Sequence, residues 1–147
     1  MTTSAVFGHG AKLQISDMAA EATFTDVAEI ESLSGPSLSA DEIDVTTHDS
    51  TDGYREFIQG LKDAGELTIE GNFIPTEDTH KDSGDASLLA SYNSGAATDF
   101  KLVFPDANNT EWEISAIVTG FEVDIPNEDK MTFSCTLKIS GKPTFNN

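Results

Sequence analysis

The sequence has little positive charge and almost no cysteine. Its 147 residues include 8 Lys and Arg against 26 Asp and Glu, which gives a formal net charge of −18. So few cations leave no basic patch to neutralise phosphates, which argues strongly against a dedicated binder of nucleic acid or of anionic membranes. The single cysteine, Cys135, allows neither an internal disulfide nor a cysteine metal site, so redox chemistry is disfavoured.

Long hydrophobic runs and a secretory signal are also missing. No apolar run approaches the ~18–20 residues of a membrane span. The first residues, Met1 to Ser4, lack the basic and apolar regions of a signal peptide. We therefore expect a soluble protein made in a cytoplasm. Apolar residues still make up 37% of the chain, so we expect one folded domain over residues 1–147, which includes a polar N-terminal arm at about 1–10 and a long inter-strand loop at 48–63.

Alternation of apolar and polar residues predicts a mainly β protein. A period of two is typical of half-buried strands, and the last strand shows it best, with Met131 to Ile139 alternating throughout. One helix is predicted over 86–92, capped by Ser83 or Asp85. We expect an antiparallel β-sandwich or barrel of about seven strands with one flanking α-helix. The predicted strands are 11–17, 24–33, 41–47, 65–74, 98–104, 110–125 and 129–140.

One predicted strand, 110–125, contains an irregularity. Its apolar phase shifts by one residue between Ala116 and Ile117. Such a shift is typical of a β-bulge, which inserts one extra residue into a strand.

Residues with catalytic or metal-binding potential are scattered. His9, His48 and His80 lie far apart without the spacing of a zinc site, so we interpret them as solvated loop histidines. Cys135 lies within an alternating strand and is expected to be a buried hydrophobic residue. The acidic loops at 49–53 and 78–82 lack the ligand spacing of a calcium loop. The sequence predicts no enzyme, no cofactor and no metal site.

The segment 48–63 departs from the strand pattern. It opens with turn-forming residues and continues with apolar residues at the spacing of an amphipathic helical turn: Tyr54, Phe57, Ile58 and Leu61. It is long for a hairpin connection. Two interpretations follow, an arm that contacts another subunit or a short amphipathic element packed on its own domain.

Several stretches share the pattern of one known family. They are residues 43–50 (IDVTTHDS), 53–67 (GYREFIQGLKDAGEL), 71–75 (GNFIP), 118–121 (VTGF), 125–126 (IP) and 136–143 (TLKISGKP). In this order they resemble the tail tube proteins of long, flexible, non-contractile bacteriophage tails, over most of the chain from about Gly35. The resemblance implies a structural virion protein with a sandwich or barrel fold, related to the type VI secretion tube protein. It also implies homohexameric rings stacked into a hollow tube through which DNA leaves the capsid.

The resemblance also suggests roles for two sets of residues. The segment 48–63 would be an arm that reaches the adjacent ring or subunit, through Asp49, Asp52, Tyr54, Arg55, Phe57, Ile58 and Leu61. Polar strand faces would line the lumen and repel the phosphates of passing DNA, with Glu42, Asp44, Glu66, Glu70, Thr132, Ser134 and Thr136 as candidates. The alternative for this second set is an ordinary solvent-facing sheet. Implied partners are other copies of the chain and the tape measure, tail tip and tail terminator proteins; no membrane is implied.

Other functional classes remain open at this stage. A monomeric acidic β-sandwich for binding or adhesion would explain the strands, but it predicts a secretion signal or an exposed aromatic platform. A cytoplasmic enzyme would need a cluster of histidine and carboxylate. Within a phage tail, assembled in the host cytoplasm, a minor tail protein or a tail terminator could share the fold.

Overall fold

The structure is a computed structural model that describes residues 3–19, 21, 23–82 and 86–146. These residues form an eight-stranded sheet with the order β2-β1-β7-β8-β9-β6-β3, in which β10 also pairs with β8, and a separate two-stranded sheet of β4 and β5. Every strand pair is antiparallel. The elements are β1 (Lys12–Ser16), β2 (Phe24–Asp26), β3 (Ile30–Ser34), β4 (Ser39–Asp44), η1 (Thr51–Gly53), β5 (Phe57–Asp63), β6 (Glu66–Asn72), α1 (Leu88–Ser94), β7 (Thr98–Val103), β8 (Glu111–Asp124), β9 (Thr132–Ile139) and β10 (Thr144–Asn146).

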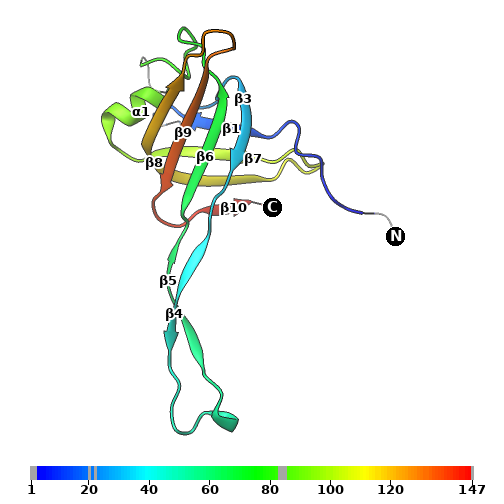
Figure 1. Ribbon diagram of the computed structural model, residues 1–147, viewed down its shortest axis with the longest axis vertical. Coiled ribbons are helices and arrows are strands. Elements are labelled where there is room, and N and C mark those ends of the chain that lie inside the picture. Colours follow the sequence, from blue (N-terminus) through cyan, green and yellow to red (C-terminus); the bar gives the residue numbers. More distant parts are fainter. Residues whose placement is uncertain (1–2, 20, 22, 83–85, 147) are drawn as a thin grey trace.

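The long strand β8 belongs to two layers. Its first part, up to Ala116, pairs with β7, and its second part, from Ala116 onward, pairs with β9. In Figure 1, β1 and β7 run crosswise to β9, β6 and β3, and α1 lies at the side of β8. The sheet therefore folds over itself at β8 and encloses the core between its two halves. This architecture confirms the predicted mainly β, antiparallel fold with one flanking helix.

The register of β8 against β9 shifts between Val118 and Gly120. Ile114, Ala116 and Val118 are buried before the shift, and Phe121 follows in the other phase. The predicted bulge is thus present, but it lies two residues later than the sequence pattern placed it. Before the shift, Ile117 lies on the same, more exposed face of β8 as Ser115.

The strands bury every second side chain in the core, as β9 shows most regularly. In β9 every second residue is buried, and Phe133, Cys135 and Leu137 are almost fully shielded from solvent. Burial raises the pKa of the Cys135 thiol to about 12, because an apolar interior disfavours the charged thiolate. The prediction that Cys135 is a buried hydrophobic residue is confirmed.

Two predicted elements have different bounds. The predicted strand 24–33 is two strands, β2 and β3, separated by a turn in which Glu29 has a positive φ of 60°. The helix begins at Leu88, and its N-cap is Ser87, whose Oγ accepts a hydrogen bond from the Ala90 backbone N–H. The caps expected from the sequence, Ser83 and Asp85, lie outside the described residues.

The interpretation of all three histidines as solvated is wrong for His80. His80 is fully buried, its Nδ1 accepts a hydrogen bond from the Ile74 backbone N–H at 3.2 Å, and Nε2 lies 2.8 Å from the Ala28 carbonyl oxygen. The first contact requires an unprotonated Nδ1, so Nε2 carries the proton and donates it to Ala28. The ring lies against Phe133, with centroids 4.8 Å apart. His80 therefore ties the loop after β6 to the turn between β2 and β3.

Candidate assembly surfaces

The hairpin of β4 and β5 projects away from the rest of the protein (Figure 1). Every residue of β4 is exposed, and in β5 only Gly60 is partly covered. Backbone pairing places Ile43 opposite Ile58 and Asp44 opposite Phe57. The hairpin thus extends as a two-stranded ribbon that does not pack on its own domain, which removes the second interpretation of segment 48–63.

The predicted amphipathic helical turn is wrong. Phe57, Ile58 and Leu61 lie in β5, and Tyr54 ends the short η1 turn. A helix of two turns is marginal on its own, whereas β4 offers backbone pairing partners along β5, interrupted by one register shift between Ala40 and Glu42. Neighbouring residues of a strand point to opposite faces, so Phe57 and Ile58 expose apolar groups on the two sides of the ribbon.

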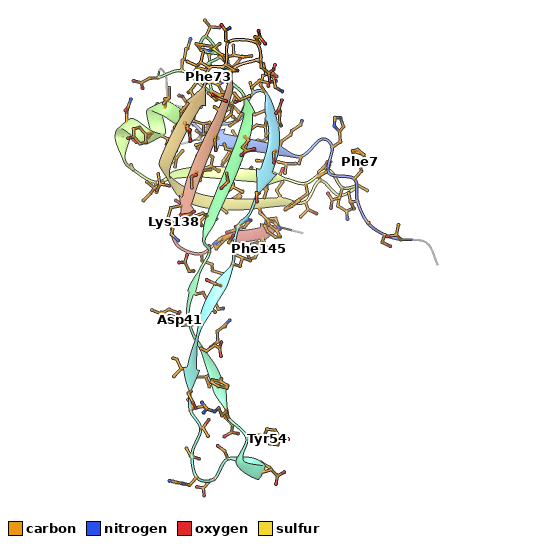
Figure 2. The ribbon with its side chains drawn as sticks, viewed as in Figure 1. Phe7, Asp41, Tyr54, Phe73, Lys138 and Phe145 are labelled. Carbon is orange, nitrogen blue, oxygen red and sulfur yellow. The ribbon has the colours of Figure 1, made fainter. Side chains whose placement is uncertain are left out.

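This degree of exposure is unusual for large apolar side chains. Leu61 is 83% exposed and Tyr54 75% exposed, and Ile43, Val45, Phe57 and Ile58 are also exposed. An isolated two-stranded hairpin is marginally stable in water. A ribbon with apolar groups on both faces is therefore suited to being covered by other chains. Figure 2 shows Tyr54 at the far end of the ribbon from Lys138 and Phe145.

Polar groups close the hairpin tip. The Ser50 Oγ donates to the Glu56 carboxylate at 2.6 Å, and the Glu56 backbone N–H donates to the Thr46 Oγ1 at 2.8 Å. Hydrogen bonds from Thr46 hold the pKa of Asp44 below its usual value, and Arg55 lies 3.7 Å from the Asp44 carboxylate. The seven predicted interface residues are therefore all on the ribbon. Phe57, Ile58 and Leu61 lie on β5, and Arg55 forms an ion pair with Asp44 of β4. Asp49, Asp52 and Tyr54 lie at the tip.

The predicted lumen residues fall into two groups. Glu66, Glu70, Thr132, Ser134 and Thr136 share the outer face of β6 and β9, where Glu70 lies opposite Ser134 and Thr68 opposite Thr136. Glu42 and Asp44 lie on the hairpin instead. Glu42 and Asp44 are thus separated from the other candidates, because most of the predicted strand 41–47 belongs to the ribbon and not to the eight-stranded sheet.

The outer face also includes residues that sequence analysis missed. Ser134 has Glu70 on one side and Glu122 on the other, and Thr132 lies opposite Asp124. Ser32 of β3 lies opposite Glu70. Glu122 and Asp124 alternate with Phe121 and Val123, so the phase after the bulge contains the signal that would have found them.

The half of the sheet formed by the second part of β8, β9, β6 and β3 has two edges that pair with no strand among the described residues. One is the outer edge of β3, which follows β6 at the end of the strand order. The other is the second half of β8, because β7 pairs with β8 only as far as Ala116. Unpaired edges expose backbone N–H and C=O groups that can bind another strand.

The base of the hairpin is held by Asp63. Its carboxylate accepts hydrogen bonds from the Gly65 backbone N–H at 2.8 Å and from the Lys138 Nζ at 3.0 Å. The hydrogen bond from Gly65, followed by the interaction with Lys138, lowers the pKa of Asp63 from its ordinary value of 3.8. The charged form of Asp63 is thus favoured in the folded protein.

Asp63→Asn should make stability less dependent on acid pH. A carboxyl group whose pKa is lower in the folded state stabilises the fold above its unfolded pKa, and this contribution disappears as pH falls through the folded pKa. We expect a lower urea midpoint for the variant than for the wild type at pH 7, and a smaller difference at about pH 3, where the unfolded-state carboxyl is already largely protonated. Glu128→Gln, at an exposed carboxylate without an ion pair in the described part of the chain, is the control. An equal gap for Asp63→Asn at both pH values would contradict the assignment.

Within the described residues, no group of three or more His, Cys, Asp or Glu side chains is arranged to hold a metal ion. No helix in that part of the chain is long and apolar enough to span a bilayer.

Comparison with known proteins shows a family and several structures with the same fold. The family model described as "Lambda phage tail tube protein, TTP" matches residues 9–146. No curated protein sequence gives a significant match. A chain of the tail of an empty gene transfer agent particle, refined with C6 symmetry, superposes with a TM-score of 0.74 at 18% identity, covering 97% of this chain and 100% of that one.

Two further solved structures share the fold. A chain of the SPP1 tail tube gives a TM-score of 0.70 at 14% identity, with 97% of this chain and 80% of that chain covered. A chain from the sheath/tube terminator structure of an extracellular contractile injection system gives 0.71 at 14% identity, with both chains covered completely, at 100%. At these identities the likeness concerns the fold.

Proposed function

Since the chain belongs to the Lambda phage tail tube protein family, we propose that it is the major subunit of a tail tube that conducts DNA during ejection. Six copies close into a ring, and rings stack into a hollow tube. The observation that carries this proposal is the projecting ribbon, which exposes large apolar side chains such as Tyr54 and Leu61 away from its own core. The ribbon serves as the arm that binds an adjacent subunit or ring.

Continuation of the sheet closes the ring. The edge of β3 in one copy pairs with the second half of β8 in the next copy, so that the four strands β8, β9, β6 and β3 repeat around the axis. The absence of another strand at either edge among the described residues supports this arrangement. Such a contact joins two different surfaces and closes when the rotation between copies fits a whole turn.

The polar outer face of β8, β9 and β6 lines the lumen. Glu66, Glu70, Glu122 and Asp124 present carboxylates there, between Thr and Ser hydroxyls. A ring of six chains with −18 each carries on the order of a hundred negative charges, which repel the DNA phosphates. DNA then passes without specific binding. Glu42 and Asp44, on the ribbon, contribute to contacts between copies instead.

The proposed place of the protein is the virion tail, assembled in the host cytoplasm. Its partners there are the tape measure, tail tip and tail terminator proteins. A terminator role for this chain is the alternative, favoured by the likeness to a chain from a tube terminator structure. The copy number of the chain in purified particles distinguishes the two, because a tube subunit is present in many rings and a terminator in one.

Assembly of the purified protein tests the proposal. We expect rings or tubes in negative-stain electron micrographs and a concentration-dependent sedimentation coefficient. Moderate salt should promote assembly, because it screens repulsion between chains of charge −18, with a Debye length of about 10 Å at 0.1 M. Protein that stays strictly monomeric under all conditions, or tubes that dissolve as moderate salt is added, would contradict the account.

A further inference from the structure

A groove opens at the base of the ribbon. It lies between the ribbon and the C-terminal segment, where Figure 2 shows Phe145 and Lys138 close to the start of the ribbon. Its volume is about 660 Å³, within the ~300–1,000 Å³ range of ligand pockets. Apolar side chains form much of the lining: Leu38, Ala40, Ala64, Ile139, Pro143 and Phe145. Leu38 and Phe145 are themselves exposed.

The groove is also lined by the lysine side chains that form no ion pair among the described residues. Six of the eight Lys and Arg residues form ion pairs with acids. The two without an ion pair in the described residues, Lys62 and Lys142, both line this groove. The one acid of its lining, Asp63, is engaged by Lys138. In a chain of charge −18, two unpaired lysines beside an apolar lining favour the binding of a segment that is acidic and partly apolar.

We propose that the groove receives the ribbon tip, residues 49–54, of a second copy of this chain. The tip carries Tyr54, which is 75% exposed. It also carries Asp49 and Asp52, whose carboxylates have no ion pair among the described residues. Tyr54 enters the apolar lining as an anchor, and the two carboxylates face Lys62 and Lys142. An aromatic anchor surrounded by opposite charges is a common arrangement at interface hot spots. The inference rests on the proposed tube function and names the receiving site of the arm.

Another exposed segment fits the groove less well. The N-terminal arm, residues 3–10, has exposed Val6 and Phe7 but no acidic side chain, so it offers nothing to the two lysines. The tip combines an exposed aromatic ring with unpaired carboxylates.

The contact between tip and base determines how copies repeat. Tip and base are the two ends of the same ribbon, so the contact joins different surfaces and adds copies in one direction. The first side of the ribbon, from Ser39 to Ser50, extends roughly 30–40 Å at ~3.3 Å per residue. Tip-to-base binding therefore displaces successive copies by about the length of the ribbon and gives an open-ended stack.

Disulfide trapping tests the contact directly. Protein with Asp52→Cys is mixed with protein carrying Lys142→Cys, and a mild oxidant is added under assembly conditions. The native Cys135 is buried and does not interfere. The matched control replaces Lys142→Cys by Lys81→Cys, at a lysine paired with Asp78 and remote from the groove. We expect at least about tenfold more cross-linked dimer for the first pair, because proximity raises the effective concentration of the thiols.

The trapping experiment can also fail in informative ways. Equal cross-linking of the two pairs would overturn the inference. So would stronger trapping of Lys142→Cys with Glu128→Cys than with Asp52→Cys, because it would place the acidic loop between β8 and β9 on the groove.

A charge swap gives an independent measurement. The double variant Lys62→Glu/Lys142→Glu should raise the protein concentration required for tubes by on the order of tenfold, since two attractive pairs become repulsive. Mixing it with Asp49→Lys/Asp52→Lys protein should restore assembly. Wild-type protein that never assembles would defeat the tube function itself. Wild-type tubes together with unchanged assembly of the Lys62→Glu/Lys142→Glu variant would defeat only the groove.

Discussion

Replacing residues 43–58 with an Asn-Gly turn is expected to abolish tube assembly and to leave a folded monomer. The replacement removes the outer part of the ribbon but keeps Glu42 opposite Gln59, and Asn-Gly forms the tight turn that such a pair of strands requires. Five exposed large apolar side chains are lost: Ile43, Val45, Tyr54, Phe57 and Ile58. Each contributes ~1.5–3 kcal/mol when buried against a partner, so no tube contact that depends on them would persist.

The folded state should not change with this truncation. None of the deleted residues is part of the core, so we expect a melting temperature within about 2 °C of the wild type. Sedimentation velocity and electron microscopy measure assembly, and calorimetry measures the fold. Tyr54→Ser is a milder companion variant, expected to raise the concentration needed for tubes. Tubes of normal length from the truncated protein would refute the role of the ribbon.

The ribbon shows where sequence patterns stop being informative. In β9, one face is buried and the other is open, so Phe133, Cys135 and Leu137 alternate with polar residues and the strand is predictable. In β5 neither face is buried within the chain, and Phe57, Ile58 and Leu61 follow no period of two. Their spacing coincides with a helical repeat over a short stretch. We propose that these side chains contact other copies, and a prediction for one chain does not contain such contacts.

The polar outer face was predictable in part. Glu66, Glu70 and Ser134 follow from the alternation of β6 and β9. Which other strands share the face depends on pairing between distant segments: Glu122 joins it through β8, and Glu42 leaves it with the ribbon. Local periodicity specifies which side of a strand is polar, but the neighbours of that strand are set by tertiary structure.

His80 is the second position where long-range contacts overrule the local pattern, and its replacement has the largest expected effect on stability. The residue sits in a polar loop, yet it is fully buried and contacts Ala28, 52 residues away in the sequence. His80→Ala leaves the Ile74 N–H and the Ala28 carbonyl without their partner and opens a cavity beside Phe133. Orphaned polar groups cost about 1–3 kcal/mol each, and removal of a buried ring adds the cavity term.

We therefore expect His80→Ala to lower the free energy of unfolding by about 3–5 kcal/mol. For a domain of this size 1 kcal/mol corresponds to roughly 2–4 °C, so the melting temperature should fall by about 6–20 °C. His48→Ala, at an exposed position of the ribbon loop, is the matched control and should leave stability unchanged. A loss below about 1 kcal/mol for His80→Ala would contradict the buried, doubly bonded imidazole.

The two large effects should separate from each other. His80 lies with Phe73 and Phe133 at the end of the domain away from the ribbon, as Figure 2 shows for Phe73 and Tyr54. Loss of His80 weakens the fold without touching the proposed arm, so variant protein that is still folded at low temperature should assemble into tubes. The truncated ribbon should give the opposite result, a stable monomer without tubes. Each measurement then reports on one half of the molecule, either the core that holds the polar face in place or the ribbon that we propose joins copies.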